Sequence, residues 1–358
     1  MVLVSNATKI VNFASMRSIL VIRLSSLGDI ILATPIVRRL QRSYPSARID
    51  VAVSERFAGV WNNNPRVHSV WRVPEAVSIE ESDTWKLEAI ESLATVSEGK
   101  YDLVVDLQNS MKSRALRKGL GREYACAPKH RLEKLALVWL KKRPSRITPI
   151  VERYEKPLSH LPMAQDTDPC ELWLPEESAQ GWYPDQRPRA SGELRIALAP
   201  GAYHATKRWP AARFAALARM LHEECCAAVV LVGGPGDSEL CTAVAIAAGV
   251  PVERADGAKT VEETVRVLDR CSVLVSNDSA VMHMAAARRV PVVAIFGSTV
   301  RELGFAPYAA PHIVVEADVS CRPCSHIGRA TCPRSHFSCM MNIEPSDVLK
   351  AAQRFINP

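Results

Sequence analysis

The chain has 358 residues, a formal net charge of +7, 47% apolar residues and 23% charged residues. This length exceeds one ordinary hydrophobic core and predicts two domains, and the composition is typical of a soluble globular protein. No apolar run is long enough to span a bilayer, and residues 1–15 lack the continuous apolar segment of a signal peptide. We therefore expect a cytoplasmic protein with its ten cysteines reduced. Residues 1–15 are expected to form a loose N-terminal extension, and the alternative is that translation starts at Met16.

The first half of the chain alternates between predicted strands and helices. An apolar run at residues 18–22 leads into a polar turn and an amphipathic helix that ends near Tyr44. Further strands are predicted at residues 48–53, 67–73, 101–107 and 123–127, and helices at 85–97, through Lys118 and at 132–140. Such alternation indicates a parallel sheet, and ligands bind at the carboxyl edge of an open parallel sheet.

The turn after the first strand carries a single carboxylate, Asp29, beside Gly28. A lone acid among small residues at this edge suggests a place where a substrate approaches the backbone closely. The alternative is that Asp29 caps the following helix, a role worth about 1 kcal/mol. Thr34-Pro35 weakens this alternative, because Thr at the N-cap and Pro at the first helical position make a better helix start.

Positive charge is concentrated between Lys112 and Arg146, where twelve basic residues are opposed only by Glu123 and Glu133. Such a stretch attracts phosphates, nucleic acid or an anionic membrane surface, and a solvated basic face without a partner is also compatible with it. The stretch lacks interleaved aromatic residues and any nucleic-acid-binding motif, which argues against a nucleic-acid-binding protein.

A change in amino-acid composition separates the two halves of the chain. Residues 142–189 are rich in proline and lack long apolar runs, so we interpret them as a linker region with a short helix at 150–160. A second run follows, with strands predicted at residues 194–199, 228–232, near 252, 273–276 and 291–296. Helices are predicted at residues 211–224, 238–248, 261–270, 280–288 and 345–355. The whole pattern predicts two doubly wound α/β domains.

Turns of the second half converge on one edge of its predicted sheet. Asp278 and Ser279 open a helix, whose free N–H groups and positive dipole end can bind a diphosphate. His283 follows on the same helical face, where packing in the core is the alternative. Lys207 lies in the turn at residues 200–209 and can neutralise a phosphate, and Asp237 ends a glycine-rich turn and could bind ribose hydroxyls.

Each of these signals has a structural alternative when it is taken alone. Asp278 and Ser279 are good N-caps, and Lys207 could be a surface residue whose neighbour Trp209 anchors a helix. Asp256-Gly257 makes a fourth turn at this edge. Four such turns at one edge of a sheet indicate a ligand-binding site more specifically than any single turn does. The Rossmann dinucleotide fingerprint and the Walker A motif are both absent from the sequence, which argues against a nicotinamide dehydrogenase or a P-loop ATPase.

Three motifs together resemble glycosyltransferase family 9, the lipopolysaccharide ADP-heptose heptosyltransferases. They are Arg-Leu-Ser-Ser-Leu-Gly-Asp-Ile-Ile-Leu-Ala-Thr-Pro at residues 23–35, Lys-Arg-Trp-Pro at 207–210 after Pro-Gly-Ala, and Ser-Asn-Asp-Ser-Ala-Val-Met-His at 276–283. The similarity runs from about Arg17 to the C-terminus, and Lys-Arg-Trp-Pro and the C-terminal cysteines look most like heptosyltransferase II. The resemblance implies a GT-B fold, in which two Rossmann-like domains face each other across a cleft.

In such a fold, residues 16–175 would bind the acceptor, residues 176–343 would bind the nucleotide sugar, and the last helix, 344–358, would pack back on the first domain. The resemblance implies transfer of heptose, with inversion, from ADP-L-glycero-D-manno-heptose to Kdo-lipid A or heptosylated Kdo-lipid A. No cofactor and no essential metal are expected, and the protein would lie at the cytoplasmic face of the inner membrane. A family 9 transferase for another nucleotide sugar and a catalytically silent nucleotide-sugar-binding protein are the alternatives.

The resemblance also implies roles for individual residues. The general base corresponds to Asp29, the diphosphate-binding lysine to Lys207, and the diphosphate- and pentose-binding helix start to Asp278, Ser279 and Ala280, where the family usually has Gly in place of Ala280. The other expected donor-binding residues are Thr206, Asp237 and His283, and the expected acceptor-binding residues are Ser26, Gly28, Lys112, Arg114 and Arg117.

Four cysteines lie close together near the C-terminus, at Cys321, Cys324, Cys332 and Cys339. One Cys-x-x-Cys pair is present and a second is absent, so the spacing matches a zinc site only in part. Zinc coordination stays open, but we expect a reduced, packed loop without a metal.

Overall fold

The computed structural model describes residues 16–75, 101–177 and 193–356, so the N-terminal extension and the helix expected at residues 85–97 lie outside the described ranges. The first half contains β1 (Ser18–Ile22), α1 (Leu27–Ile31), α2 (Thr34–Ser43), β2 (Arg48–Ser54), η2 (Glu55–Val60), β3 (Ser69–Val73), β4 (Tyr101–Asp106), α4 (Met111–Arg117), β5 (Gly121–Cys126), α5 (Arg131–Trp139), α6 (Ile150–Glu155) and η4 (Lys156–Leu158).

The second half contains β6 (Arg195–Ala199), η6 (Ala205–Lys207), α7 (Ala211–Cys225), β7 (Ala228–Val232), η7 (Pro235–Asp237), α8 (Ser238–Ala248), β8 (Val252–Ala255), α9 (Val261–Leu268), β9 (Val273–Asn277), α10 (Ala280–Ala287), β10 (Val292–Phe296), η8 (Arg301–Leu303), β11 (His312–Glu316), α11 (Ser338–Met341) and α12 (Pro345–Ile356). None of the helices in the described ranges is both long and apolar enough to cross a bilayer.

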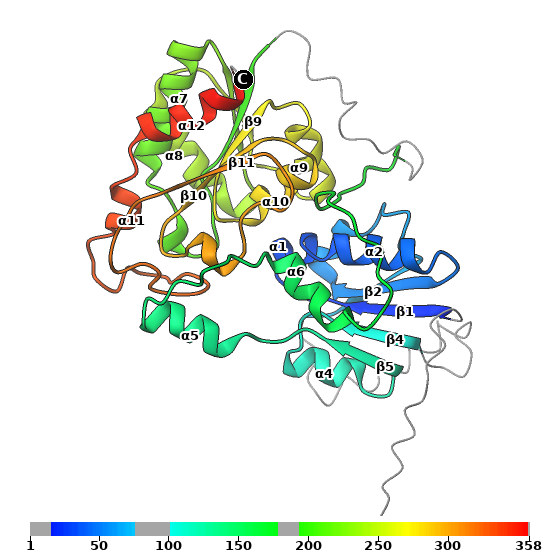
Figure 1. Cartoon of the computed structure of the whole chain (residues 1–358). Helices are drawn as coiled ribbons and strands as arrows, with labels where there is room; N and C mark the ends of the chain where they lie inside the picture. The colour runs from blue at the N-terminus through cyan, green and yellow to red at the C-terminus, as the bar shows by residue number, and fades with distance from the viewer. Residues whose placement is uncertain (1–15, 76–100, 178–192, 357–358) are drawn as a thin grey trace, which may run out of the picture.

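The strands form two separate parallel sheets, one in each half (Figure 1). The first has five strands in the order β3-β2-β1-β4-β5, and the second has six in the order β11-β10-β9-β6-β7-β8. The predicted pair of doubly wound α/β domains is therefore confirmed. The sequence patterns did not predict β11 or α11, which are a short edge strand and a single helical turn.

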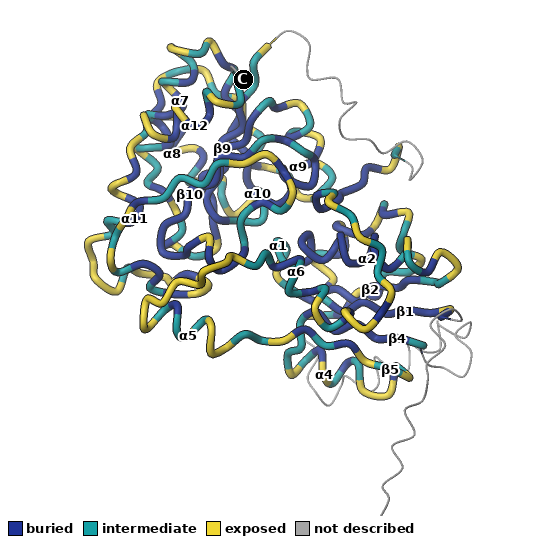
Figure 2. The backbone as a smooth tube through the Cα atoms, viewed as in Figure 1, coloured by how far each residue is buried: buried dark blue, intermediate teal, exposed yellow. Residues whose placement is uncertain are grey.

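The central strands of both sheets, such as β1, β4, β9 and β10, are buried, whereas the edge strands β3, β5, β8 and β11 are partly exposed (Figure 2). In β1 the side chains alternate: Ile19 and Val21 join one apolar cluster, and Leu20 and Ile22 join another. The same alternation divides the second sheet. One of its faces packs on α7, α8 and α12, and the other packs on α9, α10 and the first domain.

The last helix, α12, packs on the second domain, so the prediction that it returns to the first domain is wrong. Its buried residues Val348, Leu349 and Ala352 join the cluster that contains Trp209 and Phe214. The helix contacts α7, β9, β10 and β11. The apolar face of α12 predicts that the helix is buried. It does not determine which of the two domains the helix packs against.

The segment after α6 is part of the core and not a free linker. Cys170 and Leu172 are buried in an apolar cluster that includes residues of both domains. Beside them, Arg38 of α2 donates to Asp166 at 2.8 Å and to Glu171 at 3.2 Å, and its side chain is only 1% exposed. The prolines keep this segment extended, while its apolar and acidic residues attach it to α2.

Candidate functional site

A cleft of about 1360 Å³ lies between the two domains. It is lined by turns that follow strands at the points where the order of each sheet reverses, between β1 and β4 and between β6 and β9. Most of the predicted site residues line it: Ser26, Gly28, Asp29, Lys207, Asp237, Asp278, Ser279, Ala280 and His283. The topology thus explains why these turns, distant in sequence, face one another.

Asp29 is held by three neighbours on the first domain's wall. Its Oδ1 lies 2.6 Å from Nη2 of Arg23 and accepts a hydrogen bond from the Tyr154 hydroxyl at 3.1 Å. Its Oδ2 accepts a hydrogen bond from the Ser26 hydroxyl at 2.8 Å. The side chain is 17% exposed, so the carboxylate is oriented and still reaches the cleft.

The charge state of Asp29 follows from these contacts. Burial by itself would raise the pKa of Asp29, but the Arg23 guanidinium and the Ser26 hydrogen bonds outweigh burial and hold this pKa below its ordinary value. The carboxylate is therefore ionised at neutral pH. Burial and the nearby carboxylate also raise the pKa of the Tyr154 phenol well above its ordinary value, so Tyr154 stays a neutral donor.

The structure also changes the interpretation of the helix start. Asp29 is the third residue of the short helix α1, and its carboxylate accepts from the backbone N–H of the N-cap Ser26 at 3.3 Å. Thr34-Pro35 does begin a helix, α2, but Thr34 lies inside it, and its hydroxyl donates to the Ile31 carbonyl. The sequence argument from Thr34-Pro35 weakens the role of Asp29 as a helix cap. In the structure Asp29 does take part in the N-terminal cap of α1, and it also lines the cleft.

Lys207 and Asp278 form the centre of the opposite wall. Nζ of Lys207 lies 2.7 Å from Oδ2 of Asp278, which also accepts from the Thr299 hydroxyl at 2.6 Å. Ser279 is the N-cap of α10, so the first N–H groups of that helix lie beside the ion pair. A cation and a helix N-terminus at one place make a site for an anionic group.

His283 is buried where the two domains meet. A Cβ atom placed on Gly28 would lie 2.9 Å from Cδ2 of His283, so α1 and α10 are in close contact across the cleft. Burial lowers the pKa of His283 to about 4, against the opposing effects of Asp278 and Asp29. The ring is thus neutral at physiological pH, and its Nδ1 has no hydrogen-bond partner among the described residues.

Asp237 and the turn after β6 touch each other. The Asp237 carboxylate accepts from the Gly234 N–H at 3.1 Å, and a Cβ on Gly201 would collide with that carboxylate. The absence of a side chain at Gly201 therefore leaves room for the Asp237 carboxylate in this position. The fourth predicted turn differs, because Asp256 is 3% exposed and its carboxylate is bound by Arg254. Asp256 stabilises the end of β8 and does not line the cleft.

Four of the predicted binding side chains are engaged elsewhere, and none of them lines the cleft among the described residues. The Thr206 hydroxyl is buried and bonded to the backbone of Arg329. Lys112 donates to the Pro74 carbonyl, Arg114 to the Asn109 side chain, and Arg117 to the Asp106 carboxylate. The structure thus places Thr206, Lys112, Arg114 and Arg117 outside the cleft lining, with their side chains bound to nearby backbone, amide or acidic groups, and their binding roles stay predictions.

Sequence reasoning missed the two residues that set the state of Asp29. Arg23 begins the motif that contains Asp29, and its position at the end of the first strand could have suggested a partner for the acid. Tyr154 lies 125 positions from Asp29 in the helix after the basic stretch, and no local pattern connects them. Only the packing of α6 beside α1 brings its hydroxyl to the carboxylate.

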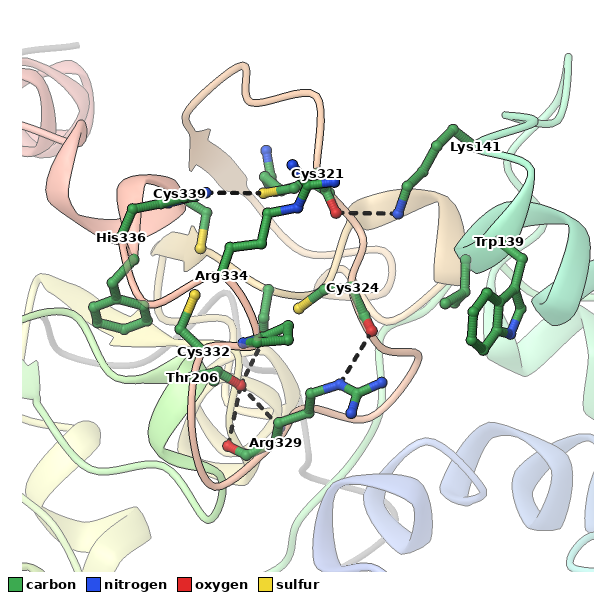
Figure 3. A pocket seen from close by; sticks show the side chains of 15 residues that line it. Trp139, Lys141, Thr206, Cys321, Cys324, Arg329, Cys332, Arg334, His336 and Cys339 are labelled. Atoms are coloured by element: carbon green, nitrogen blue, oxygen red, sulfur yellow. Dashed lines mark hydrogen bonds between the residues drawn. The ribbon is translucent and has the colours of Figure 1, made fainter.

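The C-terminal cysteines line a separate cavity of about 260 Å³ (Figure 3). Sγ of Cys321 lies 4.0 Å from Nε2 of His336, and burial raises the pKa of Cys339 to about 11. In the described part of the chain, no three His, Cys, Asp or Glu side chains form a group that could hold a metal ion. The expectation of a reduced loop without a metal stays a prediction.

Comparisons with known proteins agree with this architecture. The model of glycosyltransferase family 9 (heptosyltransferase) matches residues 92–333. Lipopolysaccharide heptosyltransferase 3 of Escherichia coli is 25% identical over 287 residues, which cover 76% of this chain and 81% of that protein.

Two solved structures share the fold. The family 9 glycosyl transferase from Veillonella parvula superposes with a TM-score of 0.73 at 21% identity, covering 95% of this chain and 97% of its own. ADP-heptose heptosyltransferase II of E. coli superposes with a TM-score of 0.66 at 23% identity, covering 95% and 98%. With the family model matching most of the sequence, the chain belongs to glycosyltransferase family 9, the heptosyltransferase family, and is a glycosyltransferase with the GT-B fold.

Proposed function

We propose that this enzyme transfers heptose from ADP-L-glycero-D-manno-heptose to the lipopolysaccharide inner core, with inversion at the anomeric carbon. One observation carries the proposal: Asp29 and the Lys207–Asp278 pair line opposite walls of one cleft. The names of the similar proteins support the donor and the pathway, since they include lipopolysaccharide heptosyltransferases and an ADP-heptose enzyme.

The proposed reaction is a single displacement. Asp29 accepts the proton of an acceptor hydroxyl as its oxygen bonds to the anomeric carbon, and the bond from that carbon to the diphosphate oxygen breaks. Such general-base assistance is worth about 10²–10⁴-fold in rate. Lys207 and the N-terminus of α10 stabilise the charge on the departing ADP, which supplies the role that a metal ion has in other transferases.

Asp237 is proposed to bind the donor ribose, and Ser279 and Ala280 to offer N–H groups to the diphosphate. Ser26 and Gly28, next to Asp29, are proposed to contact the acceptor. The acceptor class is a phosphorylated Kdo-lipid A, with or without a first heptose. The basic stretch from Lys112 to Arg146 would attract its phosphates and the anionic inner membrane, where the enzyme would act as a peripheral protein on the cytoplasmic face.

Asp29→Asn tests the base while preserving the shape of the side chain. We expect transfer to fall by at least about 10²-fold, because the amide cannot accept the proton, while the affinity for ADP stays within about twofold. Turnover and ADP binding would be measured by product analysis and calorimetry. Near-normal turnover in this variant would reject the base assignment.

The donor is tested by thermal shifts with ADP, UDP, GDP and CMP. A preference for ADP is expected, and a stronger shift with UDP would indicate a family 9 transferase for another nucleotide sugar. Transfer that persists in excess EDTA would agree with a reaction that needs no metal, and loss of transfer would contradict it.

A further inference from the structure

In the part of the chain that the structure describes, exposed apolar side chains outside the cleft are concentrated on α5 and the residue that follows it. Leu132 is 81% exposed, Leu135 51%, and Trp139 and Leu140 are each 74% exposed. Leu132, Leu135 and Trp139 are spaced three and four residues apart, so they form a stripe on one face of the helix. We call these four side chains the α5 stripe.

The opposite face of α5 is buried against the second domain. Leu137 packs on Val300 and Leu303. Just after the helix, Nζ of Lys141 donates to the carbonyls of Cys321 and Pro323 at 3.0 and 2.6 Å. The α5 stripe stays largely exposed although α5 is anchored on this side, and Trp139 also lines the edge of the cysteine-bearing cavity (Figure 3).

Positive charge surrounds the α5 stripe. Between residues 131 and 147 there are six basic residues and one acid, Glu133, which bonds to His130 at 2.7 Å. The basic residues are Arg131, Lys134, Lys141, Lys142, Arg143 and Arg146. Arg143 and Arg146 have acidic partners, at 3.1 and 3.4 Å, whereas Arg131 and Lys142 form no ion pair that is recorded in the described ranges.

We propose that the α5 stripe is the surface by which this enzyme docks on an anionic phospholipid bilayer. Leucine and tryptophan side chains enter the boundary between headgroups and acyl chains, and Arg131 and Lys142, on either side of this stripe in the sequence, contact lipid phosphates. Each basic residue near such a surface adds to the attraction, which salt screens. The choice of a bilayer rests on the proposed function, whose acceptor is linked to lipid.

The position of α5 relative to the cleft fits this role. Leu137 of α5 packs on Val300 and Leu303, and both of these residues line the cleft. The helix that carries the α5 stripe therefore borders the cleft that a lipid-linked acceptor would have to enter.

Vesicle flotation of the full chain tests the proposal. The wild type should bind vesicles of phosphatidylethanolamine and phosphatidylglycerol more tightly than vesicles of phosphatidylcholine, and salt should weaken the binding. A triple variant, Leu132→Ser, Leu135→Ser and Trp139→Ser, should bind at least about tenfold more weakly, since each apolar side chain contributes to partition. Ile246→Ser is the matched control, because Ile246 is 77% exposed on α8 in the other domain.

Insertion depth gives a second readout. Phospholipids brominated on their acyl chains should quench part of the tryptophan fluorescence of the wild type. Trp139→Phe should remove that quenching and keep the binding, because phenylalanine preserves the apolar contact. Quenching that persists in Trp139→Phe would place another tryptophan in the bilayer and overturn the proposal.

Two further outcomes separate this proposal from its rivals. A wild-type dimer in the absence of lipid that the triple variant abolishes would assign the α5 stripe to a second copy of the chain. Transfer to a water-soluble, deacylated acceptor should be unchanged in the triple variant. If vesicle binding behaves as stated but no heptose is transferred, the proposed function fails and the docking surface stands; if transfer occurs and the triple variant binds vesicles normally, the docking surface fails.

Discussion

At the scale of single residues, Asp29 combines two properties that oppose each other. Arg23 keeps the carboxylate ionised, and for the same reason lowers its affinity for a proton. The Tyr154 hydroxyl and the Ser26 hydroxyl fix its orientation. Arg23 and Tyr154 therefore act as positioning residues for Asp29, and in the proposed reaction the acceptor hydroxyl would meet an ionised carboxylate.

Replacing Arg23 by Gln should move the acidic limb of the kcat/KM profile to higher pH, because the cation that lowers the pKa of Asp29 is removed. The pKa of Asp29 is depressed in the folded state, so this interaction stabilises the fold above the ordinary carboxyl pKa and is lost as pH falls through the folded value. Arg23→Gln should thus be less stable than the wild type at neutral pH, and the difference should shrink in acid.

Tyr154→Phe is the comparison for this experiment, since it removes a hydrogen bond and leaves the charge of Arg23. Most of the depression of the Asp29 pKa should persist in it. An acidic limb that does not move in Arg23→Gln would show that Asp29 does not control the rate.

Gly201→Ala should weaken ADP binding by about tenfold or more, which corresponds to about 1.4 kcal/mol. The added methyl group would collide with the Asp237 carboxylate and displace it from the cleft. Gly257→Ala is the control, because a Cβ there meets no atom within 4 Å. Calorimetry gives both affinities, and equal values would remove Asp237 from the donor site.

At the scale of elements, most helices and strands followed their sequence patterns. The bounds of β7 and α8 equal the predicted ones, because each combines clear apolar spacing with a turn at both ends. The segment from Leu161 to Leu174 did not follow its pattern. Its prolines predict a linker, yet Leu161, Leu172 and Leu174 are in the core. An extended segment can be buried in this way if side chains form hydrogen bonds with its backbone N–H and C=O groups.

Arg38→Ala should lower the free energy of unfolding by about 3–5 kcal/mol, because it leaves the carboxylates of Asp166 and Glu171 without their main buried cation. Arg42 is the matched control on the same helix: it also pairs with Asp166, but its side chain is 41% exposed. Arg42→Ala should cost about 0–1 kcal/mol. Urea denaturation measures both, and similar losses would contradict the role of burial.

At the scale of the whole molecule, the two domains share apolar contacts as well as a cleft. One cluster includes Ile19 of the first sheet, Leu172 of the connecting segment and Leu274 of the second sheet. Gly28 and His283 meet across the cleft in the same arrangement. The proposed base, Asp29, and the proposed diphosphate site at Lys207 therefore lie on facing walls of one cleft, as transfer between two domains requires.

Gly28→Ala should lower kcat and leave the thermal stability equal or higher. Alanine favours the helix α1 more than glycine does, but its methyl group would press on His283 and separate the two walls. Gly59→Ala is the control at another contact between the domains, where the nearest atom, on Val261, lies at an ordinary 3.6 Å. Steady-state kinetics and thermal unfolding curves of both variants test this prediction. An unchanged kcat in Gly28→Ala would mean that the two walls of the cleft can move apart without loss of activity.

The sequence by itself determined the two parallel sheets, the turns at their carboxyl edges and nine of the residues that line the cleft, because these depend on local spacing and on where a strand ends. Only the tertiary structure decided which side chains are free to act. Arg117 is bound to Asp106, Thr206 to the Arg329 backbone, and α12 is buried on the second domain. Tyr154 reaches Asp29 for the same reason: partners distant in sequence are chosen by packing, which no local pattern encodes.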